Sequence, residues 1–161
     1  MTFGFILNGE DVVVDVNAEL RLVDILRSKF SIPGTKAGCY TGICGSCSII
    51  FNGEAAKSCL IPAFRIQGSE IITIEGFSLT DEYQDIVTGF SEAGLVNCGY
   101  CSTGKILAAE SLLARSLQPT RAEILAAFNG IKCRCTEPEE LVRGIMAAVE
   151  YRRRRVYGRS T

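Results

Sequence analysis

The sequence contains no histidine, and this absence excludes several kinds of site. Histidine is the usual proton-transfer residue near neutral pH, and it completes the mixed Cys/His zinc sites. A metal bound to this chain is therefore expected to be held by thiolates. A nucleotide-binding glycine loop and a clear acid-base pair are also missing, so no catalytic residue is predicted.

Long apolar runs and an excess of one charge are absent as well. No run of about 18 apolar residues, the minimum for a membrane span, occurs without a charge. The N-terminal residues lack the features of a secretory signal. The formal net charge of −1 gives no reason to expect nucleic acid or an acidic membrane surface as a partner. We therefore expect a cytoplasmic chain without a membrane span.

What the chain does contain is eight cysteines among 161 residues. In a reducing cytosol such cysteines are more often metal ligands or redox groups than disulfides. Hydrophobic residues make up 47% of the sequence and charged residues 22%, which is the balance of a folded protein. The length suits one domain or two small modules.

The first half of the chain has the pattern of a β-rich fold. Asn8-Gly9 and Asn52-Gly53 follow strand-like runs and predict two β-hairpins. The run Ile71–Ile74 predicts a further strand, and apolar residues between the hairpins fall at helical spacing. The expected N-terminal unit is a small mixed sheet crossed by a helix.

The second half has helical periodicity, and about four helices are expected there. Thr120 and Glu123 have the spacing of a capping box, and Pro138 suits the first turn of a last helix that runs to about Tyr151. The basic run Arg152–Arg155 then follows. We interpret it as a solvated or subunit-docking tail rather than a nucleic-acid site.

Four cysteines of the first half have the spacing C-x4-C-x2-C, with the fourth after eleven further residues. They are Cys39, Cys44, Cys47 and Cys59. This is the plant-type ferredoxin spacing for a 2Fe-2S cluster. Gly38, Gly42 and Gly45 allow the loop to turn sharply and to bring backbone amides close to sulfur. A zinc site is the alternative, but its first pair of cysteines is usually more closely spaced.

The other four cysteines form a C-x2-C pair and a C-x-C pair. They are Cys98, Cys101, Cys133 and Cys135. Both pairs lie at predicted helix boundaries, where free amides and the helix dipole favour thiolates. An all-thiolate zinc site needs the same four residues, so the spacing alone leaves a 2Fe-2S cluster and a zinc ion both open.

Three segments carry a family resemblance: KAGCYTGICGSCSI, VNCGYCSTGKILAAESLL and GIKCRCT. They resemble the small iron-sulfur subunit or domain of the xanthine dehydrogenase and aldehyde oxidoreductase family, over nearly the whole chain. The resemblance implies an α+β fold, in which a plant-type ferredoxin-like (β-grasp) domain spans residues 1–76. A four-helix domain would span residues 77–161 and hold the second 2Fe-2S cluster, so that all eight cysteines are metal ligands.

The resemblance also implies a function, that of the electron-transfer subunit of a molybdenum hydroxylase. The molybdenum-pterin centre would hydroxylate a heterocycle or an aldehyde on a large partner subunit, and this chain would not touch the substrate. Electrons would enter through the helical-domain cluster and leave through the ferredoxin-like one, toward FAD on a medium subunit. A hetero-oligomer is expected, with a dimer of heterotrimers as one arrangement. The alternatives are a free-standing two-cluster ferredoxin and a structural zinc protein.

By the same resemblance, Cys135 and Asn97 are expected to contact the pterin. The family usually has Gln before the C-x2-C pair, and Asn97 keeps the amide on a side chain shorter by one methylene. Lys105 stands where the family tends to place an apolar residue. Thr136-Glu137-Pro138 replaces the usual Thr-Gly-Tyr. These departures all lie near the second set of cysteines and its expected partner surface.

Overall fold

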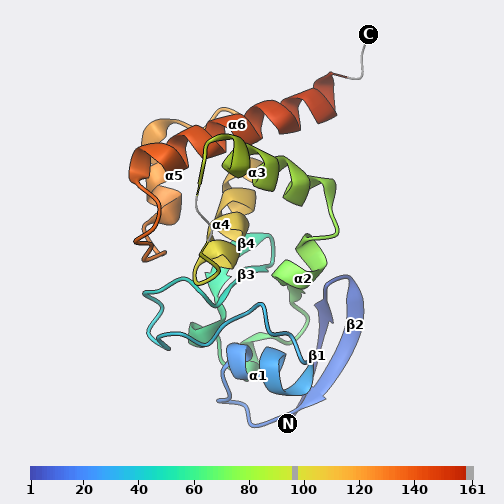
Figure 1. Ribbon diagram of the computed structural model, residues 1–161. Coiled ribbons are helices and arrows are strands. Elements are labelled where there is room, and N and C mark those ends of the chain that lie inside the picture. The colour runs from blue at the N-terminus through green and yellow to red at the C-terminus, as the bar shows by residue number, and fades with distance from the viewer. Residues whose placement is uncertain (96–97, 159–161) are drawn as a thin grey trace.

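The computed structural model describes residues 1–95 and 98–158, and its strands and helices form an α+β fold (Figure 1). The strands are β1 (Thr2–Leu7), β2 (Glu10–Asp15), β3 (Ser48–Phe51), β4 (Glu54–Lys57) and β5 (Glu70–Ile72). The α-helices are α1 (Leu22–Lys29), α2 (Ile74–Phe77), α3 (Asp81–Glu92), α4 (Ser102–Arg115), α5 (Arg121–Phe128) and α6 (Pro138–Tyr157). Short 3-10 turns lie at Ser58–Leu60 and Ala63–Arg65. Within the described ranges, no helix has both the length and the apolar character needed to cross a bilayer.

The five strands form one mixed sheet in the order β2-β1-β5-β3-β4. β1 and β5 run parallel, and the other neighbouring strands run antiparallel. Both predicted hairpins are confirmed. Their Asn-Gly turns have positive φ at both central residues, at 51° and 86° for Asn8-Gly9, which is the combination that two-residue hairpins favour. The predicted strand Ile71–Ile74 is too long, because Ile74 begins α2.

Strand β3 lies between two hydrophobic cores. Side chains alternate along a strand, so Ile49 and Ile50 point to opposite faces of the sheet. Ile49 belongs to the core between the sheet and α1, whereas Ile50 belongs to the core formed by the helices. Helix α4 contacts β3 and β4 on that second face, which joins the helical half of the chain to the sheet (Figure 1).

Two helices of the second half, α5 and α6, begin where the sequence predicts. A complete capping box, with hydrogen bonds in both directions between Thr120 and Glu123, begins α5. Pro138 is the first residue of α6. This helix continues to Tyr157, six residues beyond the predicted end at Tyr151, because the arginines of its last turns have partners on other helices.

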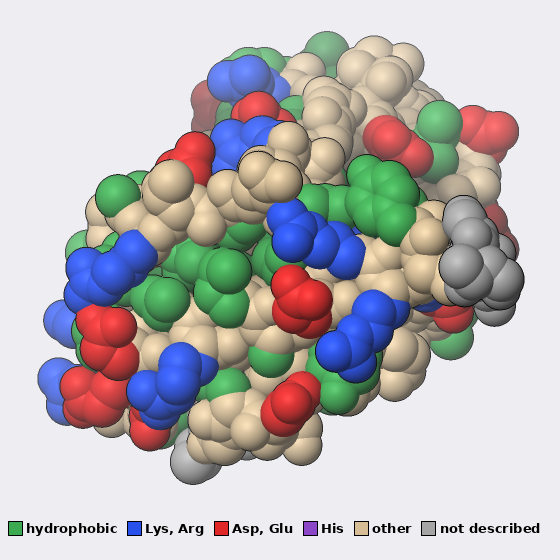
Figure 2. Space-filling model, turned by 90° about the horizontal axis from the view of Figure 1, so that it is seen from above, with side chains coloured by type: hydrophobic (Ala, Val, Ile, Leu, Met, Phe, Trp, Pro, Cys, Tyr) green, Lys and Arg blue, Asp and Glu red, His purple; other side chains and the backbone are tan. Residues whose placement is uncertain are grey.

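The interpretation of the arginine run as a solvated or docking tail is wrong for two of its members. Arg152 is 5% exposed, and its guanidinium lies 3.3 Å from an Asp85 oxygen and 2.6 Å from a Glu110 oxygen. Arg155 lies 2.9 Å from Asp85. These ion pairs fix α6 to α3 and α4. Seen from above, the surface of the molecule mixes acidic and basic side chains rather than presenting a basic block (Figure 2).

A glycine sets the distance between α3 and α6. A Cβ added to Gly89 would lie 2.7 Å from the Cα of Ala148 in α6. We expect Gly89→Ala to lower the free energy of unfolding by about 1–3 kcal/mol, because overpacking outweighs the better helix propensity of alanine. Urea denaturation measures this change. Gly4→Ala is the control, because its added Cβ meets nothing closer than 3.9 Å. Equal losses in both variants would contradict the packing argument.

Candidate metal centres

The structure brings the eight cysteines together in two groups. The first cysteine group comprises Cys39, Cys44, Cys47 and Cys59. Three of its members lie on the loop that follows α1, and Cys59 lies in the turn after β4. The β3-β4 hairpin closes this group, because the amide of Ser58 donates a hydrogen bond to the carbonyl of Cys47 at 3.2 Å. Pairing of the two strands therefore places Cys59 beside Cys47.

Glycines shape the loop of the first cysteine group as the sequence predicts. Gly42 and Gly45 have φ of 78°, a conformation that favours glycine. Gly38 serves close approach instead, since a Cβ there would lie 2.9 Å from the sulfur of Cys44. The loop can thus fold tightly around a group held by the four sulfurs.

The sulfurs of the first group differ in their ease of ionisation. Hydrogen bonds from the Thr41 hydroxyl and from the amides of Cys44 and Thr41 lower the pKa of Cys39 to about 5. Both amide nitrogens lie 3.4 Å from its sulfur. Burial raises the pKa of the Cys59 thiol to about 11. The thiol of Cys39 therefore ionises more readily than that of Cys59, and both must lose their protons to bind a metal.

The second cysteine group comprises Cys98, Cys101, Cys133 and Cys135. The first two lie where the chain enters α4, and the other two lie on the loop between α5 and α6. The sulfur of Cys135 is 3.5 Å from that of Cys133 and 3.6 Å from that of Cys98. All four line a cavity of about 470 Å³. Two chain segments thus converge on one cavity that is lined by four cysteines.

The thiols of the second cysteine group also differ in pKa. Burial raises the pKa of Cys101 to about 12. Burial also acts to raise the pKa of Cys133, but hydrogen bonds from the Cys135 amide and from the Thr136 hydroxyl lower it to about 7. The hydrogen-bond donors that stabilise a thiolate are the ones that would stabilise negative charge on a bound iron-sulfur cluster.

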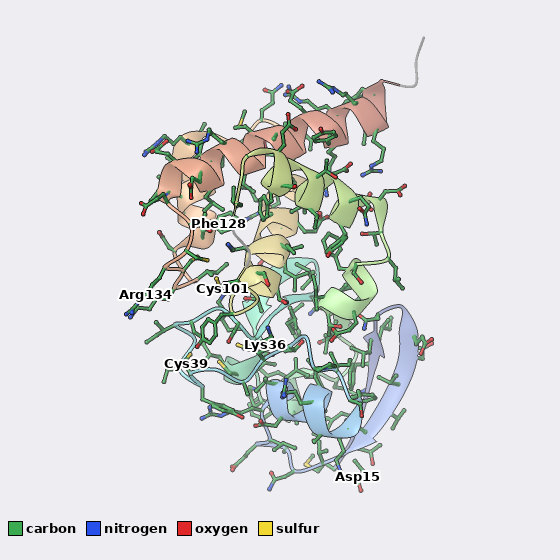
Figure 3. The ribbon with its side chains drawn as sticks, in the orientation of Figure 1. Asp15, Lys36, Cys39, Cys101, Phe128 and Arg134 are labelled. Carbon is green, nitrogen blue, oxygen red and sulfur yellow. The ribbon has the colours of Figure 1, made fainter. Side chains whose placement is uncertain are left out.

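The two cysteine groups adjoin each other. Cys44 of the first group also lines the cavity of the second. Its carbonyl accepts a hydrogen bond from the amide of Lys132, the residue before Cys133, at 3.3 Å. The ammonium of Lys36 donates to the carbonyl of Gly99, within the second group's loop. Figure 3 shows Lys36 between the loops that carry Cys39 and Cys101.

Two polar residues at the first cysteine group were not singled out from the sequence. The hydroxyl of Ser46 lies 3.0 Å from the sulfur of Cys44, and this side chain is buried. The ammonium of Lys57 donates to Ser48 at 2.9 Å, and interaction with the sulfurs of Cys47 and Cys44 opposes the fall in its pKa that burial causes. Only their positions in the sequence could have indicated them: Ser46 stands between two cysteines, and Lys57 stands two residues before another.

Of the two residues predicted to contact the pterin, the structure describes only Cys135. Cys135 is half-buried and lines the cavity of the second cysteine group. Asn97 lies outside the described residues. Arg134, between two cysteines of that group, is exposed and points away from the molecule (Figure 3). Arg134 nevertheless also lines the cavity of the second cysteine group.

Two family models match the chain, one on each half. A 2Fe-2S iron-sulfur cluster binding domain matches residues 5–70, and a 2Fe-2S binding domain matches residues 73–146. Each match includes one complete cysteine group. The second match decides between the two metals that the spacing of the second group left open, in favour of the 2Fe-2S cluster.

Relatives resemble the chain over most of its length. It is 39% identical over 150 residues to the nicotinate dehydrogenase small FeS subunit of Eubacterium barkeri, covering 93% of this chain and 96% of the relative. The structure superimposes on quinoline 2-oxidoreductase from Pseudomonas putida with a TM-score of 0.85 and 35% identity, covering 95% and 96% of the two chains. It also matches the aldehyde oxidoreductase of Desulfovibrio desulfuricans with a TM-score of 0.84 and 30% identity, over 94% of this chain and 17% of that one.

Proposed function

Because this chain belongs to the small iron-sulfur subunits of the molybdenum hydroxylase family, we propose that each of its cysteine groups holds one 2Fe-2S cluster. The chain is an electron-transfer subunit of an oxidoreductase. When bound, the clusters supply one-electron transfer. The proposed iron ligands are Cys39, Cys44, Cys47 and Cys59 for one cluster, and Cys98, Cys101, Cys133 and Cys135 for the other.

The main support for this proposal is the contact between the two cysteine groups. Cys44 belongs to the first group and lines the cavity of the second. The hydrogen bond from the Lys132 amide to the Cys44 carbonyl connects the two ligand loops through backbone atoms. This chain would therefore hold both metal centres in fixed positions, close enough to exchange an electron, while its amides donate to the sulfurs.

The relatives are named as subunits, so the chain functions in a heteromeric assembly. We place a large molybdenum-binding subunit against the second cysteine group, with Cys135 and Asn97 toward its pterin. A medium FAD-binding subunit would cover the first group, where exposed apolar side chains occur. These are Ile43, Leu60 and Phe64. Exposed apolar residues beside a metal centre suit a protein interface. A dimer of such heterotrimers is the proposed complete form.

The division into domains at residues 76 and 77 is part of the same proposal. It falls within α2 (Ile74–Phe77), a few residues after the second family match begins at residue 73. The ferredoxin-like domain would hold the first cluster, and the helical domain would hold the second. A cytoplasmic location is also proposed, because eight cysteines intended for iron must stay reduced until they are loaded.

Iron analysis tests the assignment of two clusters. Two 2Fe-2S clusters require about four irons and about four acid-labile sulfides per chain. We expect these values, no stoichiometric zinc, and two distinct electron paramagnetic resonance signals after reduction. Iron near half this amount with a single signal, or zinc in proportion to the chain, would overturn the assignment of one cysteine group.

A further inference from the structure

A lysine is buried next to the second cysteine group. Lys105 lies in the first turn of α4 and is 2% exposed, which makes it one of the largest fully buried side chains of the described residues. Its backbone amide donates to the carbonyl of Cys101 at 3.0 Å. A lysine is almost never buried to this degree without a compensating negative charge.

The residues around Lys105 indicate that the negative charge near its ammonium is that of the second cysteine group. Its ammonium donates to the hydroxyl of Thr136 at 2.9 Å, and that hydroxyl lies 3.9 Å from the sulfur of Cys135. Lys105, Thr136 and Cys133 together line a cavity of about 330 Å³. The other described residues that line it carry no acidic group. They are Leu125, Phe128, Asn129, Ile131, Pro138 and Leu141.

The charge of Lys105 also interacts electrostatically with two further sulfurs of the group, those of Cys98 and Cys101. The lysine therefore interacts favourably with negative charge at this site, in a buried setting where such interactions are screened little.

We propose that Lys105 is the buried counter-charge of the helical-domain cluster and raises its reduction potential. The inference depends on the proposed function, because it requires a 2Fe-2S cluster on the second cysteine group. Reduction adds one electron to this cluster, while no bond to Lys105 forms or breaks. A fixed ammonium beside the cluster stabilises the more negative, reduced form over the oxidised form. Lys105 is thus a positioning residue that favours entry of the electron into the cluster through its charge alone.

The chain offers a matched comparison at the other site. Lys57 is half-buried beside the first cysteine group, whose four sulfurs interact with its charge. Removing its charge should act on the ferredoxin-like cluster, and removing that of Lys105 should act on the helical-domain cluster. The two lysines therefore let a local electrostatic effect be separated from a general loss of stability.

The experiment is a redox titration of the complete complex with dithionite and mediators, followed by electron paramagnetic resonance. Lys105→Gln removes the charge but keeps a donor for Thr136, and Lys105→Met removes both. Each should lower the equilibrium constant for reduction of the helical-domain cluster by about tenfold, which corresponds to a potential lower by about 59 mV. Lys105→Arg should stay near the wild-type potential, and Lys57→Met should leave this cluster unchanged.

The outcomes separate this inference from the proposed function. If both signals are present and the potential in Lys105→Gln and Lys105→Met equals the wild-type value, the lysine is merely structural and the inference is wrong. An equal shift in Lys57→Met would also overturn it, because the effect would then not be local. If the wild-type complex gives no second 2Fe-2S signal, the proposed function itself fails.

Discussion

Substitution of Cys135 by Ser should prevent substrate from reducing either cluster. The resemblance implies that Cys135 lies against the pterin, where a cluster thiolate would accept a hydrogen bond and provide a short route for electrons. Because the second cysteine group would receive every electron that reaches the first, loss of this entry point leaves both clusters oxidised. The measurement adds a substrate to the purified complex, found by screening N-heterocycles and aldehydes, without an electron acceptor. Electron paramagnetic resonance then shows which clusters are reduced.

The matched variant is Cys47→Ser, in the first cysteine group. It should leave reduction of the helical-domain cluster by substrate intact, while delivery of electrons to the flavin fails. Dithionite serves as a control for both variants, because it reduces any cluster that is present whatever the order of transfer. If Cys47→Ser loses all substrate reduction while Cys135→Ser keeps a reduced ferredoxin-like cluster, the proposed direction of electron flow is reversed.

Replacement of Arg152 by Met should cause the largest loss of stability. Arg152 pairs with Asp85 and Glu110 and also donates to the carbonyl of Glu82, at 3.1 Å. Removing one partner of a buried ion pair leaves the other charges without compensation, which costs about 3–5 kcal/mol. We expect a loss of about 3 kcal/mol in the free energy of unfolding, because Arg155 still reaches Asp85. Urea denaturation followed by circular dichroism measures it.

The neighbouring Arg153 provides the control for this substitution. It pairs with Glu150 one turn earlier in the same helix, at 3.6 Å, and its side chain is 36% exposed. Exposed pairs of this kind contribute about 0.3–0.5 kcal/mol, so Arg153→Met should change stability only slightly. Similar losses in the two variants would show that helix propensity, rather than the buried ion pairs, explains the effect of Arg152→Met.

The local features of the fold were predictable from the sequence, and the long-range ones were not. The turns Asn8-Gly9 and Asn52-Gly53 and the capping box of Thr120 depend on residues close together in the chain, and all are confirmed. The burial of Arg152 depends on Asp85, which stands 67 residues earlier. The periodicity of a sequence does not reveal a partner so far along the chain. From the sequence alone, the run of arginines therefore resembles a solvated tail.

The same limit applies to the metal centres. Spacing and resemblance assigned the eight cysteines to two sets, and the proposal that each set holds one cluster follows that assignment. The sequence did not indicate that Cys44 would lie against the second group, because the contact requires Lys132 to approach from a distant loop. It also noted Lys105 as a departure without showing that its side chain is enclosed beside Cys101 and Thr136.

The position of β3 between two cores has a consequence for synthesis on the ribosome. Residues 1–76 emerge first and can form the sheet, but the face that carries Ile50 has no cover until α4 has been translated. A nascent chain that pauses in between displays an apolar strand surface of the kind that associates with other chains. Expression of residues 1–76 without the helical half would make this transient exposure permanent. Such a shortened chain is expected to need a chaperone or a solubilising fusion partner.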